Sequence, residues 1–303
     1  MQIVTHADDC GLSRGITSTI LDCARSGALL GASVMASGDC AEEAARGLAH
    51  AIPSRHGLPV VGVHVNILEG RALLPPEQLP LLVRPDGTFR HNLGSLCLAL
   101  AGPSSRKKQA LLDEVAAEWT AQAARIQTAI PSSRLYLDGH LHAHVLPALR
   151  PALFALLQEF PIDYVRVPSE PRYSLPAPLR LQIIGNIRRE LLRLWSHGLR
   201  EQLHKRGVRT PDCFLGAFCS GAMTMPRLVA GLAHAQKILP GDALTEIMFH
   251  PGGFGPEDTN SARHLPYRDF YLAPARKEEK ALLSSPEFHQ LLLRHDSTWQ
   301  GSL

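Results

Sequence analysis

Seven short apolar segments alternate with longer segments of helical pattern along this chain, and this alternation restricts its fold more than any other feature. The segment at 59–67 is rich in β-branched residues and mostly apolar, as expected of a strand that is buried on both faces. Strands that alternate with helices form parallel sheets, either closed as a barrel or left open. The seven predicted strands lie at 2–5, 29–36, 59–67, 134–138, 163–167, 213–218 and 244–250.

The chain is expected to form a single domain over residues 1–303. Of its 303 residues, 45% are apolar and 19% are charged, so it can bury a large core. Neither an internal repeat nor a linker with a shift in composition divides it. Two segments interrupt the alternation of strands and helices. Residues 68–104 are rich in proline and glycine and predict a long irregular loop. Residues 178–206 predict a helical insertion, as a hairpin or as one long helix.

Charge and cysteine usage exclude several classes of protein. A net charge of +3 is too small to indicate nucleic-acid binding. An uninterrupted apolar tract of about 18 residues, as a membrane-spanning helix needs, does not occur, and the first residues do not have the pattern of a signal peptide. The six cysteines have no CxxC spacing, so they predict buried thiols. We therefore expect a soluble cytoplasmic protein.

Ionisable side chains lie at the ends of five predicted strands. The stretch LDGHLHAH, residues 137–144, places three histidines directly after one of these strands. The carboxyl ends of parallel strands meet at one face, where active sites are built. Residues far apart in the sequence are therefore expected to be neighbours, namely Asp8, Asp9, His64, His140, Arg166 and His250.

These residue types predict metal-assisted hydrolysis of an amide or ester. One aspartate with two histidines is a common ligand set for a divalent metal. Of the adjacent Asp8 and Asp9, one can bind the metal while the other takes a proton from water. His250 could protonate the leaving amine or stabilise the oxyanion.

Five motifs, in order along nearly the whole chain, resemble the YdjC/ChbG carbohydrate deacetylases, relatives of the NodB-like polysaccharide deacetylases. Each motif alone has weak or moderate specificity, but five with this order and spacing are specific. Two departures from the family pattern are Cys10 and His6, neither of which is a predicted ligand. The motifs are HADDCGLSRGIT, GVHVNILEGRALLPP, YLDGHLHAHVLP, VRVPSEP and TEIMFHPG.

The resemblance implies a distorted TIM-like (β/α) barrel of about seven parallel strands that removes acetyl groups from N-acetylated amino sugars. It also implies a homodimer and one divalent ion, zinc or magnesium, with cobalt, nickel or iron as alternatives. Asp9, His64 and His140 match the family's metal ligands. Asp8 matches the general base, Arg166 the arginine that orients it, and His250 a histidine near the scissile bond.

Four further residues are predicted to bind substrate or to support the substrate site: Asn66, His142, Glu170 and Glu246.

The late part of the chain resembles the branch of this family associated with hopanoid biosynthesis, which implies a lipid-linked amino sugar as substrate. Residues 180–209 carry eight arginines and lysines against two glutamates, with apolar residues at helical spacing. Such a helix can lie on an anionic membrane surface, the only membrane contact expected here. Alternatively, its apolar face packs on the barrel or on a second subunit.

Two other functions stay open at this point. The first is a metal-dependent amidohydrolase or phosphoesterase of different specificity. The second is a barrel that binds a carbohydrate or a lipid without catalysis.

Overall fold

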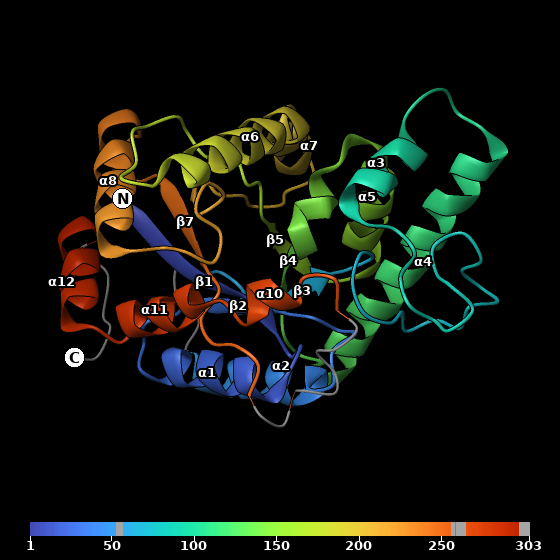
Figure 1. The fold of residues 1–303 in the computed structure, drawn as a ribbon, viewed down its shortest axis with the longest axis horizontal. Coiled ribbons are helices and arrows are strands. Elements are labelled where there is room, and N and C mark those ends of the chain that lie inside the picture. The colour runs from blue at the N-terminus through green and yellow to red at the C-terminus, as the bar shows by residue number, and fades with distance from the viewer. Residues whose placement is uncertain (53–56, 256–257, 259–264, 297–303) are drawn as a thin grey trace.

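The computed structural model describes residues 1–52, 57–255, 258 and 265–296. Seven strands form one parallel sheet in the order β5-β4-β3-β2-β1-β7-β6, curled into a TIM-like half-barrel (Figure 1). The outer strand β5 contacts the segment that precedes β6, since the Val165 amide donates to the Arg209 carbonyl at 3.0 Å. The predicted α/β class is confirmed. The strands are β1 (Gln2–Cys10), β2 (Gly31–Val34), β3 (Val61–Val65), β4 (Leu135–Gly139), β5 (Ile162–Val165), β6 (Cys213–Leu215) and β7 (Leu244–Phe249).

Helices cover the outer face of the sheet. Ser13 caps the first of them by accepting a hydrogen bond from the Ile16 amide, and Gly27 follows its end with a φ of 76°. The bounds are α1 (Arg14–Arg25), α2 (Ala41–Ala51), α4 (Arg106–Ala129), α5 (Arg150–Glu159), α8 (Met225–Ile238), α11 (Pro274–Leu283) and α12 (Pro286–His295).

Three local predictions differ from the structure. The first strand continues past Thr5 to Cys10 and so includes both aspartates. The segment 68–104 is not wholly irregular, because it contains α3 (Leu93–Leu100), which Asn92 and Ser95 cap reciprocally. Its residues are nearly all apolar, so no polar face marks the helical period. A short helix, α10 (Arg268–Tyr271), also precedes α11.

The predicted insertion at 178–206 forms two helices, α6 (Leu179–Ser196) and α7 (Leu199–His204). They are separated at Gly198, whose φ of 70° is a left-handed conformation that favours glycine. Helix α6 lies along the top of the barrel in Figure 1 and packs on η1 (His140–Val145), the 3₁₀ turn after β4. The insertion therefore covers the face where the functional residues meet.

Candidate metal and catalytic site

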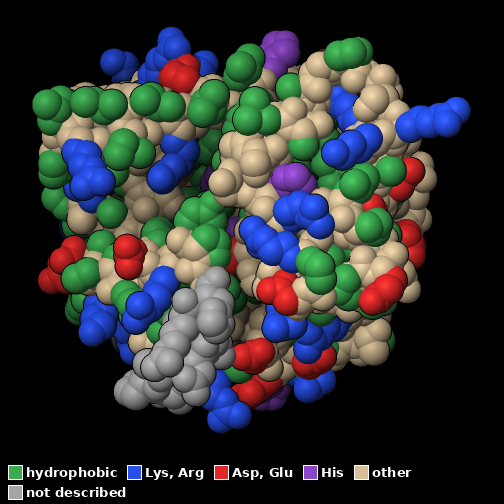
Figure 2. All heavy atoms as spheres, turned by 45° about the vertical axis from the view of Figure 1, so that its right-hand side comes forward, with side chains coloured by type: hydrophobic (Ala, Val, Ile, Leu, Met, Phe, Trp, Pro, Cys, Tyr) green, Lys and Arg blue, Asp and Glu red, His purple; other side chains and the backbone are tan. Residues whose placement is uncertain are grey.

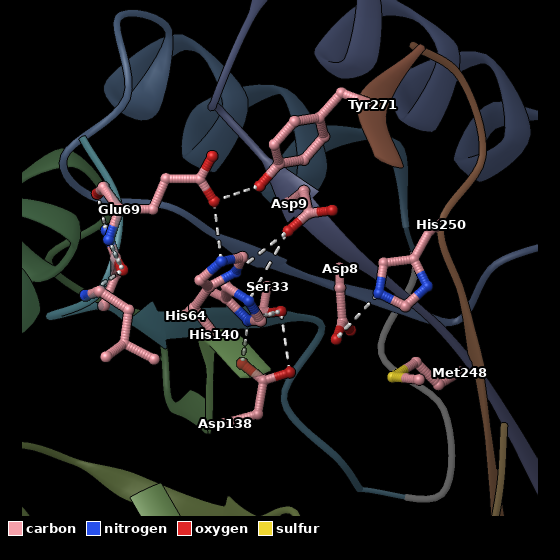
Figure 3. A network of polar contacts seen from close by, with 12 residues as sticks. Asp8, Asp9, Ser33, His64, Glu69, Asp138, His140, Met248, His250 and Tyr271 are labelled. Carbon is pink, nitrogen blue, oxygen red and sulfur yellow. Dashed lines mark hydrogen bonds and ion pairs between the residues drawn. The ribbon is translucent and has the colours of Figure 1, made fainter. Parts of the chain in front are cut away.

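The ionisable residues at the strand ends meet at one face of the barrel (Figure 3). Each side chain is at least 92% buried, as the exposed fractions of 0–8% for His250, Asp8 and Arg166 show. Three buried residues, Asp9, His64 and His140, place one possible ligand atom each within 4.8 Å of one another.

A bulge in β1 lets both adjacent aspartates face the site. Successive side chains of a regular strand point to opposite faces, which would separate Asp8 from Asp9. The pairing of β1 with β2 shifts register between Ala7 and Cys10, and Asp9 has a φ of 66°. This left-handed residue reorients the second carboxylate. Because of the bulge, the carboxylates of Asp8 and Asp9 both face the site although the two residues are adjacent, and each contacts different side chains.

The group of Asp9, His64 and His140 fits a divalent metal ion. Asp9 Oδ1 lies 3.8 Å from His64 Nε2 and 3.7 Å from His140 Nδ1. Two ligand atoms of a tetrahedral zinc ion lie about 3.4 Å apart, so small shifts would bring these three atoms around one ion.

Carboxylates hold the outer nitrogen of each histidine ring. His64 Nδ1 lies 2.8 Å from Asp138 Oδ1, and His140 Nε2 lies 2.9 Å from Glu69 Oε2 (Figure 3). Burial lowers the pKa of His140, but Asp9 and Glu69 outweigh burial and raise that pKa to about 10. Burial also lowers the pKa of His64, but the charge of Asp138 and its hydrogen bond outweigh burial, so the pKa of His64 lies above its usual value. The site therefore stabilises positive charge, as a divalent ion requires.

Asp8 is held apart from this group by a bidentate contact with Arg166. The guanidinium donates to Asp8 Oδ2 at 2.7 Å and to Oδ1 at 2.8 Å. Burial raises the pKa of Asp8 to about 6, against the opposing charge of Arg166. A carboxylate in this position can accept a proton near neutral pH.

His250 lies on the other side of Asp8, with Nε2 at 3.8 Å from Asp8 Oδ2. Burial lowers the pKa of His250 to about 3, so the ring is neutral at rest. Its backbone amide donates to Glu279 at 2.5 Å, which holds the turn after β7. The remaining oxygen of Asp9 accepts from Arg276 at 3.0 Å.

The three histidines of LDGHLHAH have separate environments. Leu141 and His142 adopt left-handed conformations, with φ of 50° and 57°, so the chain turns directly after His140. His142 lines the cavity described below. His144 is fully buried, with Nε2 at 2.9 Å from the carbonyl oxygen of Arg166. Among the three, His140 alone belongs to the candidate metal group.

The other predicted substrate residues bond to groups outside the cavity. Glu246 is inside the barrel, where it accepts from Tyr136 at 2.5 Å and from Arg166 at 2.6 Å. Glu170 accepts from the Phe218 amide at 2.7 Å, and Asn66 bonds the backbone of residues 68–69. Within the described chain these three residues have structural partners and do not line the cavity.

Several residues of the site did not stand out in the sequence. Asp138 could have been found, since it is the penultimate residue of β4, two residues before His140, and strand periodicity places both on one face. Arg276 and Glu279 gave no such signal, because they lie in the tail helix α11. Only the folded chain brings α11 beside β1.

A cavity of about 500 Å³ opens above the candidate metal group. Figure 2 shows the face of the molecule on which it lies, with a hollow near the centre. Acidic and histidine side chains form its base, and mostly apolar side chains form its walls. The wall residues from α6 are Ile184, Ile187, Arg188, Leu191, Leu192 and Trp195.

Comparisons with known proteins show the family of this chain. The family model described as YdjC-like protein matches residues 2–294. A carbohydrate deacetylase of Mus musculus is 29% identical over 260 residues, which cover 83% of this chain and 78% of the relative. A chitooligosaccharide deacetylase of Salmonella heidelberg is 26% identical over 251 residues, covering 82% and 81%.

A solved structure supports the fold alone. A protein of Enterococcus faecalis V583, named for a proposed cleavage of cellobiose phosphate, superposes with a TM-score of 0.66. The match covers 97% of this chain and 94% of the other, at 19% sequence identity.

Proposed function

Because the chain belongs to the YdjC-like protein family, we propose that it is a metal-dependent hydrolase that removes the acetyl group from an N-acetylated amino sugar. The observation that carries this proposal is the division of roles between two adjacent carboxylates. Asp9 lies with His64 and His140, whereas Asp8 is turned to Arg166 and His250. A protein that only binds a sugar or a lipid has no need of a buried base beside a metal group.

Asp9, His64 and His140 would hold the divalent ion. Two imidazoles and one carboxylate favour zinc, cobalt, nickel or iron over magnesium, which prefers oxygen ligands. When bound, the ion would polarise the acetyl carbonyl and make a water molecule more acidic. This donor set therefore supports zinc as the first metal to test.

Asp8 would act as the general base. It takes a proton from the attacking water as the new carbon–oxygen bond forms, while Arg166 keeps its carboxylate oriented. Hydrolysis of the amide also requires a proton on the departing amine nitrogen. Asp8, whose pKa is about 6, holds the proton better than His250, whose pKa is about 3. We infer that Asp8 returns this proton to the nitrogen as the carbon–nitrogen bond breaks, while the neutral His250 donates a hydrogen bond that stabilises the oxyanion.

The walls of the cavity support a finer statement about the substrate. An amino sugar is polar, yet Ile184, Leu191 and Trp195 border the space above the metal group. An apolar group attached to the sugar would cover these side chains. We therefore propose a lipid-linked N-acetylated amino sugar, the substrate that the resemblance of the late part of the chain implies. A phosphoesterase has weaker support, because the second cluster of possible ligands, which contains Asp8, is occupied by Arg166.

Acetate release tests this function. Wild-type protein with added zinc, cobalt, nickel or magnesium is incubated with soluble and lipid-linked N-acetylglucosamine conjugates. We expect release with at least one metal and a loss of at least about 100-fold in Asp8→Asn, since general-base catalysis contributes that much. Asp113→Asn, an exposed change on α4, is the matched control. Absence of release across the panel, or full activity of Asp8→Asn, would refute the proposal.

A further inference from the structure

Helix α6 exposes its most apolar face. Five large side chains, the outer stripe of α6, follow one another at spacings of three or four residues and therefore lie on one face. Leu179 is 73% exposed, Leu194 is 68% exposed and Ile187 is 58% exposed. Figure 2 shows a row of hydrophobic side chains along its upper left edge, where α6 lies. The outer stripe consists of Leu179, Ile183, Ile187, Leu191 and Leu194.

The buried face of α6 is less apolar than the exposed one. Its members are Gly185, Arg189, Leu192 and Ser196, which lie opposite the outer stripe on a helix of 3.6 residues per turn. The sequence left three surfaces open for the apolar face of this helix: a bilayer, the barrel or a second subunit. The outer stripe does not pack on the barrel, so a bilayer and a second subunit remain. With this orientation, α6 exposes an apolar surface to water, which is unfavourable unless a partner covers that surface.

The outer stripe is continuous with the wall of the active-site cavity. Ile187 and Leu191 are exposed and also line the cavity, as does Ile184, which is 44% exposed. An apolar surface thus runs from the outside of α6 towards the metal group. A partner that covers the outer stripe would therefore also lie over the mouth of the cavity.

Charge favours an anionic partner for this surface. Helix α6 carries four arginines against Glu190 alone. Arg180 is exposed at the start of the stripe, and Arg172 and Arg193 both contact Glu190. In a symmetric dimer through this face, two positively charged helices would oppose each other. An anionic bilayer is complementary to both the charge and the apolar stripe.

No described helix is both long enough and apolar enough to cross a bilayer. We propose that the outer stripe of α6 docks on the surface of an anionic lipid bilayer, with the cavity mouth facing the lipid. The helix lies in the interface, and the exposed Arg180 and the part-exposed Arg193 contact lipid phosphates, whereas Arg189 is buried. The delivery of a lipid-linked sugar through this contact rests on the proposed deacetylase function, whereas the contact itself does not.

Co-sedimentation of the full chain with vesicles tests the contact. One vesicle is phosphatidylcholine alone, and the other contains about one third phosphatidylserine. We expect binding to the anionic vesicle that weakens at high salt, because charged contacts to the surface are screened. The double variant Ile183→Glu/Leu194→Glu should bind at least about tenfold more weakly, since two apolar side chains become charged.

Leu293→Glu is the matched control, because Leu293 is 42% exposed on α12, away from α6. It should bind vesicles as the wild type does. Ile183 and Leu194 do not line the cavity, so the double variant should release acetate from a soluble conjugate at the wild-type rate. This readout separates failure of the docking proposal from failure of the proposed function.

Three outcomes would overturn the docking proposal. The first is that wild-type protein binds neither vesicle at low salt, and the second is that the double variant binds vesicles as the wild type does. The third is that wild-type protein is a dimer that does not bind vesicles and the double variant is a monomer, which would assign the outer stripe to a second copy of the chain.

Discussion

Replacement of Asp138 by asparagine tests whether the carboxylate beneath His64 prepares that ring for a metal. Asp138 Oδ1 lies 2.8 Å from His64 Nδ1. Its other oxygen accepts from Ser33 at 2.9 Å and lies 2.6 Å from a nitrogen of Arg166. The two carboxylate oxygens of Asp138 thus accept from three donors, which belong to His64, Ser33 and Arg166. Asparagine offers one oxygen and one NH₂ group, so in either orientation the NH₂ group faces at least one donor.

The consequences follow from the orientation of the amide. If its nitrogen faces His64, Nδ1 must lose its hydrogen, and the hydrogen moves to Nε2, the atom 3.8 Å from Asp9. A protonated Nε2 cannot bind a metal. Loss of such a supporting carboxylate weakens metal binding about 10- to 100-fold, which corresponds to about 1.4–2.8 kcal/mol. If the amide turns the other way, Arg166 loses a partner and unfolding costs about 1–3 kcal/mol less.

Two measurements separate these outcomes. Calorimetric titration of the metal-free protein with zinc gives the affinity, and urea unfolding in the presence of a chelator gives the free energy of unfolding. The control is Asp113→Asn, which makes the same chemical change on the exposed face of α4. A zinc affinity of Asp138→Asn within about twofold of the wild type, with unchanged unfolding, would refute the supporting role of this carboxylate.

Two further predictions concern neighbouring residues. His140→Ala should abolish stoichiometric zinc binding in a metal analysis of the purified protein, whereas His142→Ala should retain it; the reverse pattern would exclude His140 as the ligand. Arg166→Met should lower the free energy of unfolding by about 3–5 kcal/mol in urea, because it leaves Asp8, Asp138 and Glu246 buried without their shared cation. An unfolding free energy within about 1 kcal/mol of the wild type would contradict that reasoning.

The parallel sheet and the position of the site could be predicted from the sequence. Strand and helix periods are local, so the run from Val61 to Val65 predicts a buried strand wherever it lies in the fold. The C-terminal ends of parallel strands must meet, and this geometry predicted that Asp9, His64 and His140 are neighbours. The loop at 68–104 was less predictable, because the apolar helix α3 has no polar face.

The partners of the buried charges were decided by the tertiary structure. Arg276 contacts Asp9 across 267 positions of sequence, and a pairing at that separation leaves no local pattern. The turn after His140 depends on left-handed conformations at Leu141 and His142, which few non-glycine residues adopt and which their identities do not predict.

Helix α6 separates the two kinds of information most clearly. Its periodicity predicted an amphipathic helix, and the structure contains one. Hydrophobic residues at helical spacing give a helix an apolar face. They do not determine whether that face points to the core or to solvent, because this depends on what the helix packs against. The sequence by itself therefore determined that α6 has an apolar face, and only the packing of Gly185 and Leu192 on the barrel turned that face outwards.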